Sequence, residues 1–126
     1  MKYAETARRL LYAMEISNTT QQDLSNKSGV SKSSISHYVN GSNEPGNKSA
    51  YAMANVLGVN PLWLMGIDAP MAPESLIKEM TETETNIVLA FRNASSDTQA
   101  AVCAVLGVKR DTELSKEMYT KSSKEA

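Results

Sequence analysis

Residues 20–41 have the sequence TQQDLSNKSGVSKSSISHYVNG, which is typical of two short helices joined by a tight turn. Thr20 and Ser31 are of the type that caps helix N-termini, and they precede segments 21–27 and 32–39. Gly29 lies between these segments, where a left-handed backbone is easiest for a residue without a Cβ atom. The stretch therefore predicts a helical hairpin with a sharp turn.

The apolar and small residues of this hairpin have the spacing that a helix-turn-helix motif requires. Leu24, Val30 and Ile35 must meet to hold the two helices at their angle. Ser25 is small where the helices cross, and Gly29 makes the turn. Any helical hairpin can show such a pattern, so the flanking sequence has to support the interpretation.

The segments around the hairpin also have helical periodicity, and none shows sustained β-type alternation. Residues 2–15 and 48–57 place apolar side chains three and four positions apart, and Asn60-Pro61 opens a short helix that ends at Gly66. The expected inward residues are Ala7, Leu10, Leu11, Met14, Ala50, Met53, Ala54 and Leu57, and the short helix contains Leu62, Trp63 and Leu64. We expect Trp63 in the core rather than on a base-stacking surface. An all-α fold with five helices over residues 1–66 is predicted.

The remainder of the chain is predicted to be a helical extension. Residues 67–73 contain two prolines and are expected to form a linker. Within residues 74–108, helices are predicted near 83–93 and 97–106, each opened by a capping box. The boxes are Thr81-x-x-Glu84 and Ser96-x-x-Gln99. Residues 109–126 are polar and charged, and are predicted to be a disordered tail.

Charge is distributed unevenly along the chain, although the net charge is only −1. Residues 1–66 contain six Lys or Arg and four Asp or Glu, which gives +2, whereas residues 67–126 contain seven against ten, which gives −3. A mildly basic front half fits a nucleic-acid surface and fits an ordinary solvated surface equally well. Cys103 is the single cysteine and no apolar run is long enough to span a membrane, so we expect a soluble cytoplasmic protein.

The sequence gives little support to an enzyme. His37 and Cys103 are the single histidine and cysteine, and they lie in different predicted regions. No spacing suggests a metal site, and Gly41 and Gly46 belong to a turn rather than to a phosphate-binding loop. We predict no catalytic residue, no metal and no cofactor.

Linked motifs in residues 2–66 resemble the Xre-type helix-turn-helix domain of lambdoid and Gram-positive phage repressors. The motifs are Thr20-Gln21, Gly29-Val30-Ser31, Ile35-Ser36, Asn40-Gly41, Leu57-Gly58-Val59 and Trp63-Leu64-Met65-Gly66. Residues 57–71 are particularly similar to the end of small phage-repressor N-terminal domains. The resemblance implies a five-helix, lambda-repressor-like domain that inserts its third helix into the DNA major groove. It also implies a transcriptional regulator, most simply a phage or prophage repressor.

The third helix offers the candidate base contacts. Its polar side carries Lys32, Ser33, Ser36 and His37, opposite Ile35, and these side chains can hydrogen-bond to base edges. The family pattern implies readers at the first, second and sixth helix positions, which are Lys32, Ser33 and His37. Each of them taken alone can also be an ordinary surface residue.

Candidate phosphate contacts lie on either side of this helix. Gln21 opens the second helix, where its amide and the helix N-terminus can hold a phosphate, and the family pattern implies the same role. Asn40, Ser42, Asn43 and Lys48 are further candidates on the loop that follows the third helix. These four residues fit plain turn-forming roles equally well.

The apolar residues of the extension have two open interpretations. The set consists of Ile87, Val88, Phe91, Val102 and Leu106. They can fold back on the front domain or form a homodimer interface, and a dimer suits a two-fold operator in double-stranded DNA. The alternative function is an antitoxin-like or partner-regulated interaction module, sequestered by a toxin or an antirepressor protein.

Overall fold

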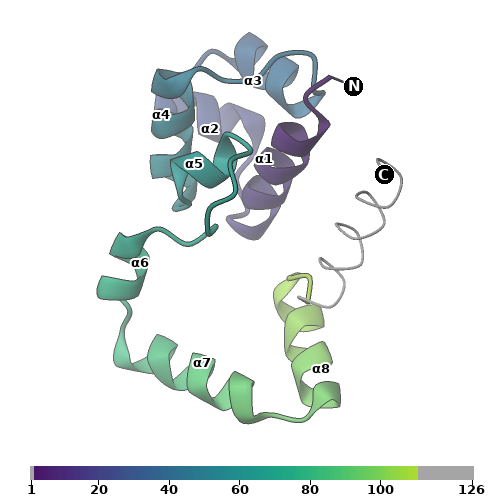
Figure 1. The fold of residues 1–126 in the computed structure, drawn as a ribbon, viewed down its shortest axis with the longest axis vertical. Coiled ribbons are helices and arrows are strands. Elements are labelled where there is room, and N and C mark those ends of the chain that lie inside the picture. Colours follow the sequence, from purple (N-terminus) through teal and green to yellow (C-terminus); the bar gives the residue numbers. More distant parts are fainter. Residues whose placement is uncertain (1, 111–126) are drawn as a thin grey trace. The chain divides into compact units, whose positions relative to one another are not determined.

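A computed structural model describes residues 2–110 of the chain. These residues form eight α-helices and no β-strand, which confirms the predicted all-α fold. The described residues divide into two compact units, residues 2–80 and residues 81–110 (Figure 1). The first unit contains α1 (Ala4–Ile16), α2 (Gln21–Ser28), α3 (Lys32–Val39), α4 (Asn47–Leu57), α5 (Pro61–Leu64) and α6 (Glu74–Lys78). The second contains α7 (Glu82–Asn93) and α8 (Ser96–Leu106).

The core of the first unit takes one large, fully buried side chain from each of its first five helices. These side chains are Leu10, Leu24, Ile35, Met53 and Leu64, in chain order. Helix α1 contacts α3 and α5, α2 contacts α3 and α4, and α4 contacts α5. Complete burial of one such side chain contributes about 1.5–3 kcal/mol. The five helices therefore form a single core that fixes the orientation of α3.

Short polar residues begin α2 and α3 as predicted. The Thr20 hydroxyl accepts from the Asp23 backbone N–H (3.1 Å), and the Asp23 carboxylate accepts from the Thr20 N–H (3.3 Å). The Ser31 hydroxyl accepts from the Ser34 N–H at 3.1 Å. Gly29 has φ +80°, and a Cβ atom added there would meet nothing within 4 Å. Glycine is thus required in the turn for its backbone conformation rather than for space.

One of the residues expected in the core is exposed. Leu11 is 48% exposed, so its prediction as an inward residue was wrong. Its neighbour Leu10 is fully buried, and one residue along a helix turns a side chain by about 100°. Trp63 is partly buried and packs against the core, as predicted. The other inward residues named for the front helices are buried.

The segment predicted as a linker lies against the first unit. The Asn60 backbone N–H donates to the Met71 carbonyl oxygen at 2.8 Å, and the Met71 side chain packs against the core. Helix α6 follows directly, although no sequence pattern predicted it. The compact unit therefore extends to residue 80, beyond the boundary at residue 66 that the sequence favoured.

Helix α7 begins with the predicted capping box. The Thr81 hydroxyl accepts from the Glu84 N–H at 3.1 Å, and the Glu84 carboxylate accepts from the Thr81 N–H at 2.9 Å. None of the residues of α7 is buried, and Cys103 is the buried residue of α8. The second unit therefore has a much smaller interior than the first.

Helix α8 begins one residue earlier than predicted. Its cap is Ser95, whose hydroxyl accepts from the Thr98 N–H at 3.2 Å, so the assignment of Ser96 as the cap was wrong. Both adjacent serines are of the type that caps a helix, and the capping-box pattern favoured Ser96 because Gln99 lies three residues after it. Gln99 has a different role, because its amide donates to the Phe91 carbonyl oxygen at 2.6 Å.

The predicted disordered tail falls mostly on residues 111–126, which lie outside the described residues. Residues 109 and 110 of this segment are described, and the Arg110 guanidinium donates to the Ser96 hydroxyl at 3.2 Å. No helix within residues 2–110 combines the length and apolar composition needed to cross a membrane.

Candidate nucleic-acid interface

Helix α3 has one buried side and one polar, exposed side. Ile35 is fully buried in the core cluster that also contains Leu24 and Val30. The predicted base contacts Lys32, Ser33, Ser36 and His37 are all exposed. They form two pairs spaced four residues apart, so they share one face of the helix. The structure thus brings the four predicted residues together on one outward surface.

Hydrogen bonds within the turn hold α3 against α2. The Ser25 hydroxyl donates to the Val30 carbonyl oxygen at 2.7 Å. The Gly29 N–H donates to the Ser25 carbonyl at 2.9 Å, and the Val30 N–H donates to the Ser28 hydroxyl at 3.1 Å. Ser25 was predicted only from its small size, and its hydroxyl adds a specific bond that sequence spacing did not indicate.

The N-terminus of α2 places Gln21 at the first helical position, half-buried. Its first turn also contains Asp23, whose pKa is lowered from 3.8 by hydrogen bonding to the side chain and then the backbone of Thr20. The Asp23 carboxylate is therefore charged near neutral pH. A phosphate bound at this turn would depend on the Gln21 amide and on helix N–H groups rather than on local positive charge.

The other predicted phosphate contacts surround the C-terminal end of α3. Asn40, Ser42 and Asn43 are exposed in the loop, and Lys48 is exposed in the first turn of α4. Ser42 is not a free hydroxyl, because its oxygen lies 3.1 Å from Nδ1 of His37 and 2.8 Å from Oδ1 of Asn40. The loop is thereby bonded to the last turn of α3.

The structure adds Lys2 to the candidate residues. The Tyr3 backbone N–H donates to the Gly41 carbonyl oxygen at 3.1 Å, which brings the start of α1 beside the loop that follows α3. Lys2 is exposed, and its ammonium lies 5.4 Å from the centroid of the Tyr3 ring. No local sequence signal could reveal this proximity, because it depends on how α1 packs against α3.

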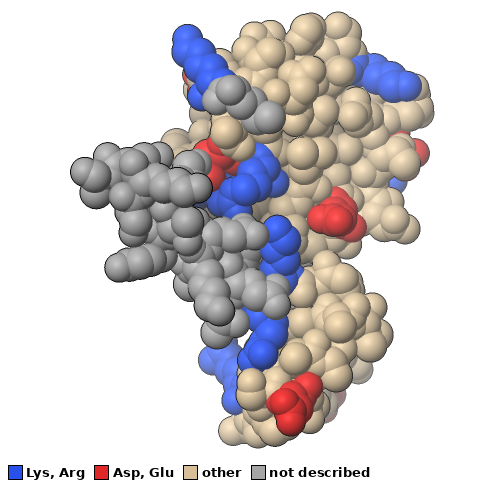
Figure 2. Space-filling model, turned by 90° about the vertical axis from the view of Figure 1, so that its right-hand side faces the viewer, with Lys and Arg blue, Asp and Glu red and all other residues tan. Residues whose placement is uncertain are grey.

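Charged side chains are sparse on this part of the surface. The upper end of the molecule, which carries α3 in Figure 1, is mostly uncharged in Figure 2, with Lys or Arg side chains at its edges. Among the candidate contacts, hydroxyl and amide side chains outnumber the lysines. Such groups can hydrogen-bond to both base edges and phosphates without supplying a strong electrostatic attraction.

The fold and this surface agree with a comparison against protein families. Residues 10–64, from the middle of α1 to the end of α5, match the family model described as helix-turn-helix. These residues form a helix-turn-helix domain of the Xre type. It is a DNA-binding transcriptional regulator, and this family is a regulatory rather than an enzyme family. No curated protein and no solved structure matches the chain.

The residues predicted to form a dimer interface differ in exposure within the second unit. Ile87 is 55%, Val88 38% and Leu106 65% exposed. Phe91 and Val102 are partly buried. Two further apolar residues that the sequence did not single out are also exposed, Leu89 at 53% and Val105 at 86%. Both helices of this unit thus present apolar side chains to solvent.

Proposed function

We propose that this regulator is a phage-type repressor that binds a two-fold operator as a dimer, with α3 in the major groove. The observation that carries the proposal is the polar face of α3. Lys32, Ser33, Ser36 and His37 are exposed, while Ile35 behind them is fully buried and fixes the helix. The major groove admits an α-helix and displays donors and acceptors to such side chains.

Each polar residue is assigned a role by its chemistry. Lys32 can donate to O6 or N7 of guanine, and Ser33 and Ser36 can pair with several bases. Contacts to phosphates would position the helix without reading sequence. We assign these contacts to Gln21, Asn40, Asn43 and Lys48, and we add Lys2 because of its place beside the loop.

Dimer formation is supported by the exposed apolar residues of α7 and α8. One short recognition helix reads few base pairs, and a second copy doubles the contact. Sedimentation velocity of the full chain should show a dimer. Ile87→Glu should shift it to a monomer, whereas Thr85→Glu, which adds the same charge on the same helix, should leave it dimeric. A wild-type monomer at micromolar concentration would contradict this part of the proposal.

Sequence-specific binding is tested by in vitro selection of random duplex DNA with the purified full-length protein. We expect enrichment of a two-fold site with half-sites about one helical turn apart. A single unpaired half-site would support base reading and contradict the dimer. No enrichment would contradict the proposal and favour the antitoxin-like alternative, in which the apolar residues of α7 and α8 bind a partner protein.

A further inference from the structure

The imidazole of His37 belongs to a hydrogen-bond network with the loop that follows α3. The Ser42 hydroxyl oxygen lies 3.1 Å from His37 Nδ1, 2.8 Å from Asn40 Oδ1 and 3.2 Å from the His37 carbonyl oxygen. The Ser42 backbone N–H donates to the same carbonyl at 3.1 Å and to Asn40 Oδ1 at 3.3 Å. Three residues therefore constrain one another at the end of the recognition helix.

The direction of each hydrogen bond follows from one donor whose identity is certain. The Ser42 backbone N–H can only donate, so the Asn40 atom that it meets is the amide oxygen, which can only accept. The Ser42 hydroxyl has a single hydrogen, and its two oxygen neighbours, Asn40 Oδ1 and the His37 carbonyl, can accept this hydrogen but cannot donate one. If the hydroxyl donated to His37 Nδ1 instead, two oxygens would face each other at 2.8 Å with no hydrogen between them.

The Ser42 hydroxyl oxygen is consequently the acceptor in its hydrogen bond with His37, and Nδ1 must carry the hydrogen that it donates. In a neutral imidazole with hydrogen on Nδ1, the other nitrogen, Nε2, is a hydrogen-bond acceptor. His37 is exposed at the sixth position of α3, on the face assigned to base contacts.

We infer that Asn40 and Ser42 fix His37 as an acceptor, so that it selects a base with an amino group in the major groove. Adenine presents N6 and cytosine presents N4 as donors there, whereas guanine and thymine present acceptors at O6 and O4. Ser42 is then a positioning residue that acts through His37, rather than a phosphate contact. The choice of base rests on the proposed function, but the state of the imidazole does not.

The imidazole is tested first on the free protein. The chain has one histidine, so a long-range ¹H–¹⁵N spectrum of untagged protein at about pH 8 reports His37 alone. We expect hydrogen on Nδ1 in the wild type and in Ser42→Thr, which keeps the hydroxyl, and a shift toward hydrogen on Nε2 in Ser42→Ala. A wild-type spectrum with hydrogen on Nε2 would overturn the inference, whatever the protein does with DNA.

The base choice is tested by selecting random duplexes in parallel with wild type, His37→Ala, Ser42→Ala and Ser42→Thr. The position that loses its preference in His37→Ala should favour adenine or cytosine in the wild type. Ser42→Ala should reduce that preference about fivefold or more and leave the other positions unchanged, while Ser42→Thr retains it. Circular dichroism melting confirms that each variant is folded.

Two outcomes of the selection would overturn the inference. One is a guanine or thymine at the position read by His37. The other is a uniform loss of affinity in Ser42→Ala with all preferences intact, because that result identifies a phosphate contact. If the wild type selects no site at all, the proposed function fails, and the spectrum of the free protein still decides the state of the imidazole.

Discussion

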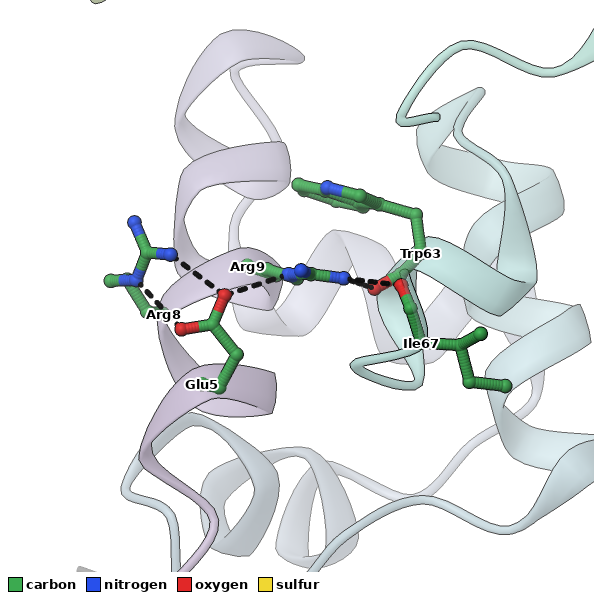
Figure 3. A network of polar contacts seen from close by, with 5 residues as sticks. All are labelled: Glu5, Arg8, Arg9, Trp63 and Ile67. Atoms are coloured by element: carbon green, nitrogen blue, oxygen red, sulfur yellow. Dashed lines mark hydrogen bonds and ion pairs between the residues drawn. The ribbon is translucent and has the colours of Figure 1, made fainter. Parts of the chain in front are cut away.

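The guanidinium of Arg9 donates from Nη1 to the carbonyl oxygen of Trp63 at 2.7 Å, across 54 residues of sequence (Figure 3). The same nitrogen donates to the Ile67 carbonyl at 2.9 Å, and Nε donates to the Glu5 carboxylate at 2.8 Å. The guanidinium also lies over the Trp63 ring, 5.4 Å from its centroid. Arg9 thus joins α1 to the carbonyl group of Trp63 in α5 and to that of Ile67, which follows α5. Because α1 also contacts α3, these contacts help to hold the helix that carries the candidate base contacts.

Replacing Arg9 by methionine keeps an unbranched side chain but removes every donor. The Arg9 side chain is only 13% exposed, and its hydrogen bonds to Trp63 and Glu5 are partly buried. We expect Arg9→Met to lower the free energy of unfolding of the first unit by about 1–3 kcal/mol. Urea unfolding followed by fluorescence measures this loss, because Trp63 is the single tryptophan.

The matched control for this substitution is Arg8→Met. Arg8 forms an ion pair with the same Glu5 at 2.7 Å, but its side chain is 39% exposed. Exposed ion pairs contribute at most about 1 kcal/mol, so Arg8→Met should lower the free energy of unfolding less than Arg9→Met does. Equal losses in the two variants would show that the contacts to α5 do not stabilise the domain.

Lys32→Ala tests a direct base contact. The variant should bind the selected duplex about 1–3 kcal/mol more weakly and lose preference at one base pair, because a base contact carries sequence information. Fluorescence anisotropy on duplexes with each single substitution measures both effects. Lys27→Ala, which removes the same charge from the last turn of α2, is the control and should keep every preference. Unchanged affinity and preference in Lys32→Ala would remove Lys32 from the interface.

Gln21→Ala tests a contact that does not read sequence. A phosphate contact positions the protein equally on every duplex, so affinity should fall by a similar factor across the same set. A loss confined to one base pair would mean that Gln21 contacts a base instead.

The capping box of α2 predicts that the free energy of unfolding depends on pH in the acidic range. The pKa of Asp23 in the folded protein lies below its ordinary value of 3.8 because of hydrogen bonding to Thr20. A lowered folded-state pKa means that the stabilisation is complete above the ordinary value and is lost as the pH falls through the folded-state value. Asp23→Asn should therefore be less stable at neutral pH and lose less stability below about pH 4. Urea unfolding of both proteins across this range should show converging curves, and parallel curves would contradict the role of the carboxylate.

Much of the helix-turn-helix could be predicted from the sequence because its determinants are local. Thr20 and Ser31 cap the helices that follow them, and Gly29 takes the left-handed turn, each within a few residues of the segment it controls. Ile35 on the buried side of α3 also defined the opposite, exposed side. The candidate base contacts could therefore be predicted from the helical periodicity together with the family resemblance.

The remaining features depend on contacts between distant segments. The bonds from Arg9 to Trp63 and from Tyr3 to Gly41 connect helices that no spacing rule relates. Lys2 could consequently be identified as a candidate contact only from the structure. At α8 the local rule chose the wrong register, because Gln99 completes the capping-box pattern with Ser96 while Ser95 is the cap.

The central claim, that α3 contacts DNA through its polar face, is tested most directly by titrating ¹⁵N-labelled full-length protein with the selected duplex and a scrambled one. With the selected duplex, the largest amide shift changes should occur at Lys32, Ser33, Ser36 and His37, with further changes at Gln21 and the loop after α3. The scrambled duplex should perturb the phosphate contacts more than the face of α3. Changes confined to α7 and α8, with α3 unaffected by either duplex, would contradict the claim.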